Sequence, residues 1–188
     1  MSTLVSHLPE IQDIVMRYGI RTLIETGVGE PKGFASGGLA VAELLGLRGL
    51  SCDIDEGSVE AARTRFPEAV VYHGTSTAFL EKMLPLAHGP CFVWLDAHFP
   101  GDASAPMWPV WDDLALLRGY ERHVIWCDDM QHVRDPENPA CKGQRVGVDG
   151  WPGDTTHTIA EYKACLADTH VAAIVGTVLR FTPKDRDA

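Results

Sequence analysis

Four short apolar runs, each followed at once by polar residues, constrain the fold of this chain more than any other feature. The runs read LIETGVG at 23–29, LSCD at 50–53, FVWLDAH at 92–98 and VIWCDD at 124–129. In a parallel α/β sheet, the carboxyl ends of such strands meet at one edge, and ligands bind in the crevice there. The runs therefore predict one site that combines a glycine turn, several carboxylates and a histidine.

Strand-like and helix-like segments alternate along the chain. Strands are expected at 21–26, 50–54, 70–72, 91–95, 123–127, 171–175 and 177–182, and helices at 7–18, 39–45, 57–65, 78–86, 109–118 and 156–167. This alternation predicts an α/β fold with a mostly parallel seven-stranded sheet and helices on both of its faces. Only Gly176 separates the last two strands, which form either a tight antiparallel pair at the end of the sheet or one bulged strand.

The bulk properties of the chain are those of one acidic globular domain. Its 188 residues are enough for a single domain with a sizeable core. Residues 1–20 contain a lead-in helix, and the Pro- and Gly-rich segment 131–154 is expected to be a long loop that acts as a lid. A net charge of −10 argues against nucleic-acid binding over a broad surface, because phosphate contacts need Lys and Arg.

Neither a membrane segment nor an export signal is evident in the sequence. No apolar stretch approaches the roughly 20 residues that cross a bilayer, and the N-terminus lacks a basic segment followed by an apolar one. None of the five cysteines forms a CxxC pair, and Cys52, Cys91 and Cys127 lie in strands that are expected to be buried. We therefore expect a cytoplasmic protein with no membrane partner.

Motifs at the expected strand ends resemble those of the class I S-adenosylmethionine-dependent methyltransferases. The matching segments are ETGVG at 25–29, CDIDEGSVEAAR at 52–63, HGTS at 73–76 and LDAH at 95–98, followed by the antiparallel strand ending. The resemblance covers residues 21–183 and implies the Rossmann-like methyltransferase fold with S-adenosylmethionine as cofactor. The chain departs from the family pattern where the glycine loop continues as GVGEPKG and where the third motif has no acid.

The resemblance also assigns cofactor-binding roles to particular residues. The residues concerned are Glu25, Gly27, Gly29, Asp53, Thr75 and Ser76. The glycines let the backbone approach a ligand closely, Asp53 matches the acid that holds the ribose, and Glu25 can meet the methionine ammonium directly or through water. Without the resemblance, Glu25 and Asp53 would be interpreted as solvated strand-end or capping residues and the glycines as an ordinary turn.

Three carboxylates follow the other two apolar runs. If those strands are neighbours, Asp96, Asp128 and Asp129 come close together, which is unfavourable unless a proton or a cation neutralises them. Magnesium takes oxygen ligands of this kind. The arrangement also resembles the metal-dependent O-methyltransferases, which implies that these three residues bind Mg²⁺. The alternative is that Asp128 and Asp129 cap the following turn and that Asp96 contacts substrate or backbone directly.

His98 lies two residues beyond Asp96 and is the candidate general base. Its imidazole titrates near neutral pH and can accept the proton of an acceptor hydroxyl, with Asp96 as the second candidate catalytic residue. Alternatively, His98 is a surface histidine or supports another residue of the site.

These observations favour a methyltransferase that acts on a hydroxyl of a small molecule such as a sugar or an aromatic, with Mg²⁺ assistance. Methyl transfer depends on placement of the nucleophile, so no catalytic Ser or Cys is required. The loops at 99–109 and 131–154 would select the acceptor, and the N-terminal helix and terminal strands offer a surface for a homodimer. Two alternatives stay open: a metal-dependent hydrolase or hydroxylase, and a non-catalytic cofactor-binding module of the same fold.

Overall fold

A computed structural model describes residues 3–97, 108–133, 154 and 156–184. His98, and most of the two loops that were expected to select the acceptor, lie outside the described residues. Within the described ranges, no helix is both long enough and apolar enough to span a bilayer.

The described residues form a seven-stranded sheet with the order β3-β2-β1-β4-β5-β7-β6. The strands are β1 (Thr22–Thr26), β2 (Arg48–Asp53), β3 (Val70–His73), β4 (Cys91–Leu95), β5 (Val124–Cys127), β6 (His170–Val175) and β7 (Val178–Pro183). Strands β1 to β5 are parallel to one another, whereas β7 is antiparallel to both β5 and β6. The predicted sheet, with its antiparallel terminal strand, is thereby confirmed.

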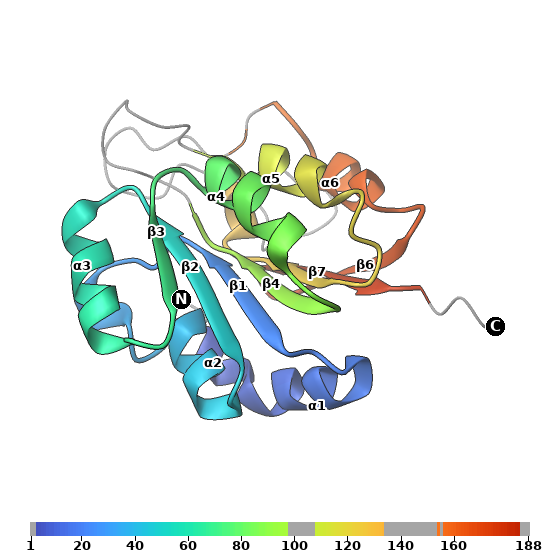
Figure 1. Ribbon diagram of the computed structural model, residues 1–188. Coiled ribbons are helices and arrows are strands. Elements are labelled where there is room, and N and C mark those ends of the chain that lie inside the picture. Colours follow the sequence, from blue (N-terminus) through green and yellow to red (C-terminus); the bar gives the residue numbers. More distant parts are fainter. Residues whose placement is uncertain (1–2, 98–107, 134–153, 155, 185–188) are drawn as a thin grey trace.

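Helices cover both faces of this sheet (Figure 1). They are α1 (Leu8–Tyr18), α2 (Gly38–Leu45), α3 (Glu56–Arg65), α4 (Ser76–Met83), α5 (Val110–Leu117) and α6 (Ile159–Cys165). Figure 1 shows α4, α5 and α6 on one face, and α1, α2 and α3 on the other. Short 3₁₀ turns occupy Leu4–His7, Pro31–Gly33, Leu84–Leu86 and Met130–His132.

The core consists of apolar layers on the two faces of the central strands. Every residue of β1, β4 and β5 is buried, as expected for parallel strands covered on both sides. On one face, Leu95 belongs to the same apolar cluster as Phe79 of α4 and Leu114 of α5. On the other face, Trp94 belongs to a cluster with Ile11 of α1. The alternating side chains of β4 therefore join both layers.

Local capping explains where two helices differ from the sequence-based expectation. Helix α4 begins two residues early because the Thr75 hydroxyl accepts a hydrogen bond from the backbone N–H of Ala78. Helix α6 begins at Ile159 instead of residue 156 because Thr158 and Glu161 form a reciprocal capping box. At the chain's end, β6 and β7 form the tight antiparallel pair, joined through Gly176 with φ 62°.

The strand order reverses at the boundary between β1 and β4. The chain builds β2 and β3 outward on one side of β1, then crosses to place β4 and β5 on the other side. At such a reversal the loops that follow the two strands diverge and leave a crevice at the carboxyl ends, where α/β sheets bind ligands. The fold thus places the ends of the four apolar runs around one opening.

Candidate active site

A pocket of about 960 Å³ lies at this edge of the sheet. Its walls come from the ends of β1, β2 and β4, from the loops that follow them, and from the start of the chain. The described residues that line it include Thr3, Leu4, Glu25, Gly27, Gly29, Lys32, Asp53, Thr75, Ser76, Thr77, Trp94, Asp96, Asp112, Asp128 and Asp129. All four polar clusters of the sequence therefore meet at one pocket whose volume suits a small-molecule ligand.

The glycine turn after β1 adopts the conformation that its sequence predicts. Gly27 and Gly29 have φ values of 81° and 71°, in the left-handed region that favours glycine. A Cβ on Gly27 would lie 2.9 Å from the carbonyl oxygen of Asp96. A Cβ on Gly29 would meet no atom within 4 Å. The first glycine thus permits close approach to the end of β4, while the second leaves space beside the pocket.

Asp53 fixes the loop that faces it across the pocket. Its Oδ2 accepts a hydrogen bond from the backbone N–H of Gly29 at 3.0 Å, and its Oδ1 accepts one from the backbone N–H of Asp55 at 2.9 Å. Asp55 in turn caps α3 by accepting from the N–H of Ser58. The carboxylate therefore holds its own orientation at the end of β2 and ties the glycine turn to that strand.

Glu25 lines the pocket but is bound on both of its oxygens by the protein. Its Oε1 accepts a hydrogen bond from the N–H of Gly38 at the start of α2, and its Oε2 accepts one from the Ser51 hydroxyl at 2.9 Å. A Cβ on Gly38 would lie 2.8 Å from Oε1, so only glycine fits there. Burial raises the pKa of Glu25 to about 7. In this structure Glu25 holds α2 against the sheet, and its contact with an ammonium group stays a prediction.

The third motif places a helix N-terminus at the pocket instead of an acid. Thr75 caps α4, and Ser76 and Thr77 form its first turn. The Thr77 hydroxyl donates to Oδ1 of Asp113, a fully buried residue of α5, at 2.9 Å. An acid therefore does lie behind this motif, but it comes from a different helix.

The three aspartates that were expected to bind a metal all line the pocket, yet each is held in its own local contact. Asp96 Oδ2 accepts from the indole N–H of Trp94 at 3.2 Å. Asp128 Oδ1 accepts from the backbone N–H of Asp129 at 2.7 Å, and Asp129 Oδ1 accepts from the amide of Gln131 at 2.7 Å. Asp129 itself has a left-handed backbone with φ 54°.

Binding of a divalent cation by these aspartates stays a prediction. Within the ranges that the structure describes, no group of three or more His, Cys, Asp and Glu side chains is placed to hold a metal ion. The aspartates lie at the predicted strand ends, but Asp128 and Asp129 are consecutive and their side chains are held by different local hydrogen bonds. Asp129 precedes the turn Met130–His132 but makes no side-chain capping hydrogen bond to it, so the capping alternative is not confirmed either.

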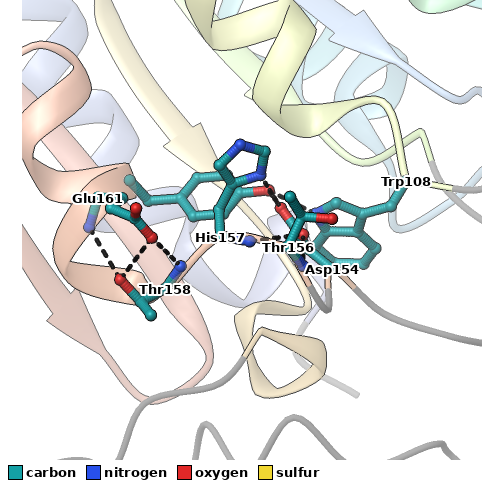
Figure 2. Close-up of polar contacts among 7 residues, drawn as sticks. Trp108, Asp154, Thr156, His157, Thr158 and Glu161 are labelled. Atoms are coloured by element: carbon teal, nitrogen blue, oxygen red, sulfur yellow. Dashed lines mark hydrogen bonds and ion pairs between the residues drawn. The ribbon is translucent and has the colours of Figure 1, made fainter.

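A network of polar and aromatic side chains joins Trp108, just before α5, to the start of α6 (Figure 2). Asp154 Oδ2 accepts from the Tyr162 hydroxyl at 2.6 Å and lies 2.8 Å from His157 Nδ1, while the Trp108 indole N–H donates to the Tyr162 oxygen at 2.9 Å. The ring of Trp111 stacks on His157 with 3.9 Å between centroids. These two tryptophans therefore help hold α6 in place.

Sequence reasoning missed several residues that shape the pocket. Ser51 and Gly38, which bind Glu25, lie in an apolar strand and in a glycine-rich loop, where neither stood out. Asp113, which lies near the start of the helix expected at 109–118, was not singled out as a site residue. The alternation of apolar residues along α5 could have revealed it, since Val110, Asp113, Leu114 and Leu117 share the buried face.

Solved structures confirm the fold. The SAH-bound methyltransferase PaMTH1 of Podospora anserina is 13% identical, with a TM-score of 0.52 over 95% of this chain and 78% of that one. DesVI of Streptomyces venezuelae is 14% identical, with a TM-score of 0.54 over 95% and 91%. The O-methyltransferase TomG of Streptomyces achromogenes, solved with SAM, is 18% identical, with a TM-score of 0.55 over 95% and 80%.

The fold is therefore the Rossmann-like fold of the class I S-adenosylmethionine-dependent methyltransferases. No protein-family profile and no curated protein sequence matches the chain. At these low identities the structural similarity establishes the architecture alone, and the activity has to be argued from the residues of the pocket.

Proposed function

We propose that this protein is an S-adenosylmethionine-dependent methyltransferase that methylates a hydroxyl group of a small molecule. The observation that carries the proposal is the pocket at the strand-order reversal, where the glycine turn and Asp53 face one another in a fold that holds SAH or SAM in solved structures. The hydroxyl acceptor is supported by the similarity to TomG, an O-methyltransferase.

The residues of the pocket fit this cofactor. Gly29 leaves open space beside a carboxylate, Asp53, that can accept hydrogen bonds from ribose hydroxyls. Acidic side chains predominate in the lining, which favours a ligand that carries a sulfonium and an ammonium. The cofactor, when bound, supplies a methyl group that is already activated for in-line displacement.

On the acceptor side, we assign Asp96 as the residue that orients the hydroxyl and takes its proton. It lies at the end of β4, its Oδ2 is bound by Trp94, and its backbone N–H donates to the Thr26 hydroxyl at 3.1 Å. These contacts hold the carboxylate at the pocket wall, where an acceptor can be aligned with the methyl group. His98, two residues further on, is the second candidate base and lies outside the described residues.

Magnesium assistance has no donor set among the described residues, so no step is assigned to a metal. The need for Mg²⁺ is tested by measuring methyl transfer from labelled S-adenosylmethionine to a panel of sugar and aromatic hydroxyls. Each reaction is run with EDTA and with added Mg²⁺. Equal rates in EDTA agree with the carboxylate arrangement seen here. A rate that requires Mg²⁺ would instead support the predicted metal site.

Isothermal titration tests the proposal directly. We expect the wild-type protein to bind S-adenosylmethionine and Asp53→Ala to weaken the binding about tenfold or more, because a carboxylate that accepts two hydroxyl protons is lost. Asp53→Asn keeps an acceptor oxygen for the loop and should fall in between, while Asp168→Ala, an exposed control, should bind as the wild type does. Absence of binding by the wild type would refute the proposal.

Product analysis separates the alternative activities. A hydrolase or hydroxylase would convert substrate without a methyl donor, whereas a non-catalytic module would bind the cofactor and transfer nothing to any acceptor. We also propose a small-molecule acceptor and a cytoplasmic location. The net charge of −10 supports the absence of a nucleic-acid partner. The proposed homodimer is tested by sedimentation equilibrium, in which a single species at the mass of one chain would refute it.

A further inference from the structure

One buried hydroxyl group, that of Thr26, joins the ends of β1 and β4. Its Oγ1 accepts hydrogen bonds from the backbone N–H of Asp96 at 3.1 Å and from the backbone N–H of Ala97 at 3.3 Å. Thr26 is the last residue of β1 and is fully buried. Asp96 and Ala97 are the first two residues after β4, which pairs with β1 in parallel. The hydroxyl therefore holds the chain at the point where it leaves the sheet.

The two N–H groups depend on this hydroxyl to different degrees. That of Asp96 also donates to the backbone carbonyl oxygen of Thr26, at 3.1 Å, and so continues the ladder of the sheet. For the N–H of Ala97, the Thr26 hydroxyl is the acceptor that the described part of the chain provides. Loss of the hydroxyl would therefore leave the N–H of Ala97 unpaired and spare the ladder bond of Asp96.

The glycine turn contacts the same short segment. A Cβ on Gly27 would lie 2.9 Å from the carbonyl oxygen of Asp96 and 3.0 Å from the Cα of Ala97, so the two backbones meet with no side chain between them. The N–H of Gly27 donates to the carbonyl of Cys52, near the end of β2, at 3.0 Å. Thr26 and Gly27 therefore form a backbone link between the Asp53 side of the pocket and the loop that follows β4.

Thr26 itself is not placed to meet a ligand. Gly27, Asp96 and Ala97 all line the pocket, whereas Thr26 is not one of the described residues that do so. A hydroxyl oxygen has two lone pairs, and the two backbone N–H groups occupy both of them. Any influence of Thr26 on a bound molecule therefore passes through the residues whose backbone it holds.

We propose that Thr26 is a positioning residue for methyl transfer: its hydroxyl holds the backbone of Asp96 and Ala97 against the glycine turn, and so fixes the Asp96 carboxylate relative to the cofactor. The inference rests on the proposed function and on the role assigned there to Asp96. In-line transfer is sensitive to small misplacements of the reacting groups. Loss of the hydroxyl should therefore slow methyl transfer much more than it weakens cofactor binding.

The test compares Thr26→Val, which keeps the branched shape and loses the hydroxyl, with Thr26→Ser, which keeps the hydroxyl. With labelled S-adenosylmethionine and the best acceptor of the sugar and aromatic panel, kcat of Thr26→Val should fall about tenfold to a hundredfold. The Kd of S-adenosylhomocysteine, measured by isothermal titration, should stay within about threefold of the wild type. Thr26→Ser should restore kcat to within about threefold. Thr22→Val, the same change at the buried first residue of β1 and away from the pocket lining, should alter neither value.

Amide hydrogen exchange, followed by NMR without any ligand, measures the hydrogen bond itself. The amide of Ala97 should be protected in the wild type, exchange about tenfold faster or more in Thr26→Val, and be protected again in Thr26→Ser. The amide of Asp96 should change less, because its bond to the Thr26 carbonyl remains. If Thr26→Val does not fold, Thr26→Ala takes its place. An Ala97 amide that exchanges freely in the wild type overturns the inference before any variant is made.

The outcomes separate this inference from the proposed function. A wild type that binds no S-adenosylhomocysteine, or that methylates no hydroxyl of the panel, overturns the proposed function and the role of Thr26 with it. A wild type that methylates an acceptor, together with a Thr26→Val protein of unchanged kcat, overturns the role of Thr26 while the proposed function stands. A Thr26→Val protein whose loss in affinity matches its loss in kcat likewise overturns it, since the hydroxyl would then only support the cofactor site.

Discussion

Glu25 illustrates how one side chain at the end of β1 joins segments that are distant in the sequence. Its two oxygens bind the first N–H group of α2 and the hydroxyl of Ser51 on β2, and the residue is only 2% exposed. Burial raises its pKa to about 7, so its charge changes near neutral pH. Glu25 therefore positions the walls of the pocket and also makes the stability of the fold depend on pH.

This dependence has a definite sign. The pKa of Glu25 lies above its ordinary value of 4.5, so between about pH 4.5 and 7 the folded protein holds a proton that the unfolded chain has lost. The contribution of Glu25 to the free energy of unfolding is therefore complete below that window. It falls as the pH rises through the window, by about 1.4 kcal/mol per pH unit for one proton. Glu25→Gln keeps an oxygen for Gly38 and should remove this slope. Urea unfolding at several pH values measures it, and identical slopes for the two proteins would contradict the assignment.

Gly27→Ala should disturb both the fold and the pocket. Its φ of 81° is costly for alanine, and the new Cβ would lie 2.9 Å from a backbone oxygen of Asp96 that cannot easily move. We expect a loss of about 2–4 kcal/mol in the free energy of unfolding, together with weaker cofactor binding. Gly19→Ala is the matched control: its φ is 63° with no atom within 4 Å of the Cβ, so strain alone should cost about 1 kcal/mol. If the two variants lose equal free energy of unfolding, the close approach of the new Cβ to the Asp96 carbonyl oxygen does not matter.

At the residue scale, the motifs predicted the residues whose role follows from backbone geometry. Gly27, Gly29 and Asp53 lie at the pocket as expected because a strand followed by a turn places them there. Asp113 and Ser51 could not be found in this way. Their roles arise from contacts between elements that are 36 and 26 residues apart in the sequence, which no local pattern encodes.

At the scale of elements, α6 depends on polar contacts around its N-terminus. Thr158 and Glu161 form the capping box, and Asp154 binds the backbone N–H groups of Thr156 and His157 (Figure 2). Burial alone would raise the pKa of Asp154, but the hydrogen bonds from Tyr162 and its other partners lower it overall. A short helix is thus held by its cap and by its packing against α5.

Thr158→Ala should destabilise the protein by about 1 kcal/mol, because the first turn of α6 loses a hydrogen-bond acceptor. Thr64→Ala on α3 is the control, since that exposed hydroxyl only donates back to the carbonyl of Glu60 and should matter little. Thermal unfolding of both variants measures the difference. Equal melting temperatures would mean that the capping box contributes nothing to stability.

The elements themselves were predictable from apolar periodicity, and β4 was placed at its observed bounds, Cys91–Leu95. The errors lie at the ends of elements. Strand β2 begins at Arg48 instead of residue 50, and α4 begins early because the Thr75 hydroxyl caps it. In the sequence, a capping residue looks like any other polar loop residue. Predicted helix ends therefore differ from the observed ends by about two or three residues.

At the scale of the whole molecule, the sheet carries a second pH-sensitive feature away from the pocket. His123, just before β5, is 5% exposed, and its Nδ1 accepts from the N–H of Cys91 at 3.4 Å. His170 at the start of β6 bonds to the His123 carbonyl through Nε2 at 2.9 Å. Burial lowers the pKa of His123 to about 4, so this side chain is neutral throughout the physiological range.

His123 should therefore limit stability in acid. Its folded pKa lies below the ordinary 6.5, so its contribution is complete above pH 6.5 and is lost as the pH falls through about 4, on the order of 3 kcal/mol in total. His123→Asn keeps an acceptor for Cys91 and cannot titrate. The ratio of folded to unfolded protein should fall less for this variant than for the wild type between about pH 6.5 and 4. An unchanged acid transition would contradict the prediction.

The alternation of strands and helices predicted the α/β class and the mostly parallel sheet. In such a sheet the carboxyl ends of parallel strands meet at one edge, which is why four strand ends converge on one pocket. The metal triad stays a prediction, because placing three carboxylates at neighbouring strand ends does not determine where their oxygens point. Asp128 accepts a hydrogen bond from the next residue, Asp129, and Asp129 accepts one from Gln131, two residues further on. These local contacts orient the two carboxylates.

The most direct test of the central claim is a crystal structure of this protein grown with S-adenosylhomocysteine. We predict one ligand in the pocket at the strand-order reversal, with its ribose hydroxyls on Asp53 and its adenine beside Ser76. A ligand bound at any other place, or a pocket that stays without ligand at saturating concentration, would contradict the account.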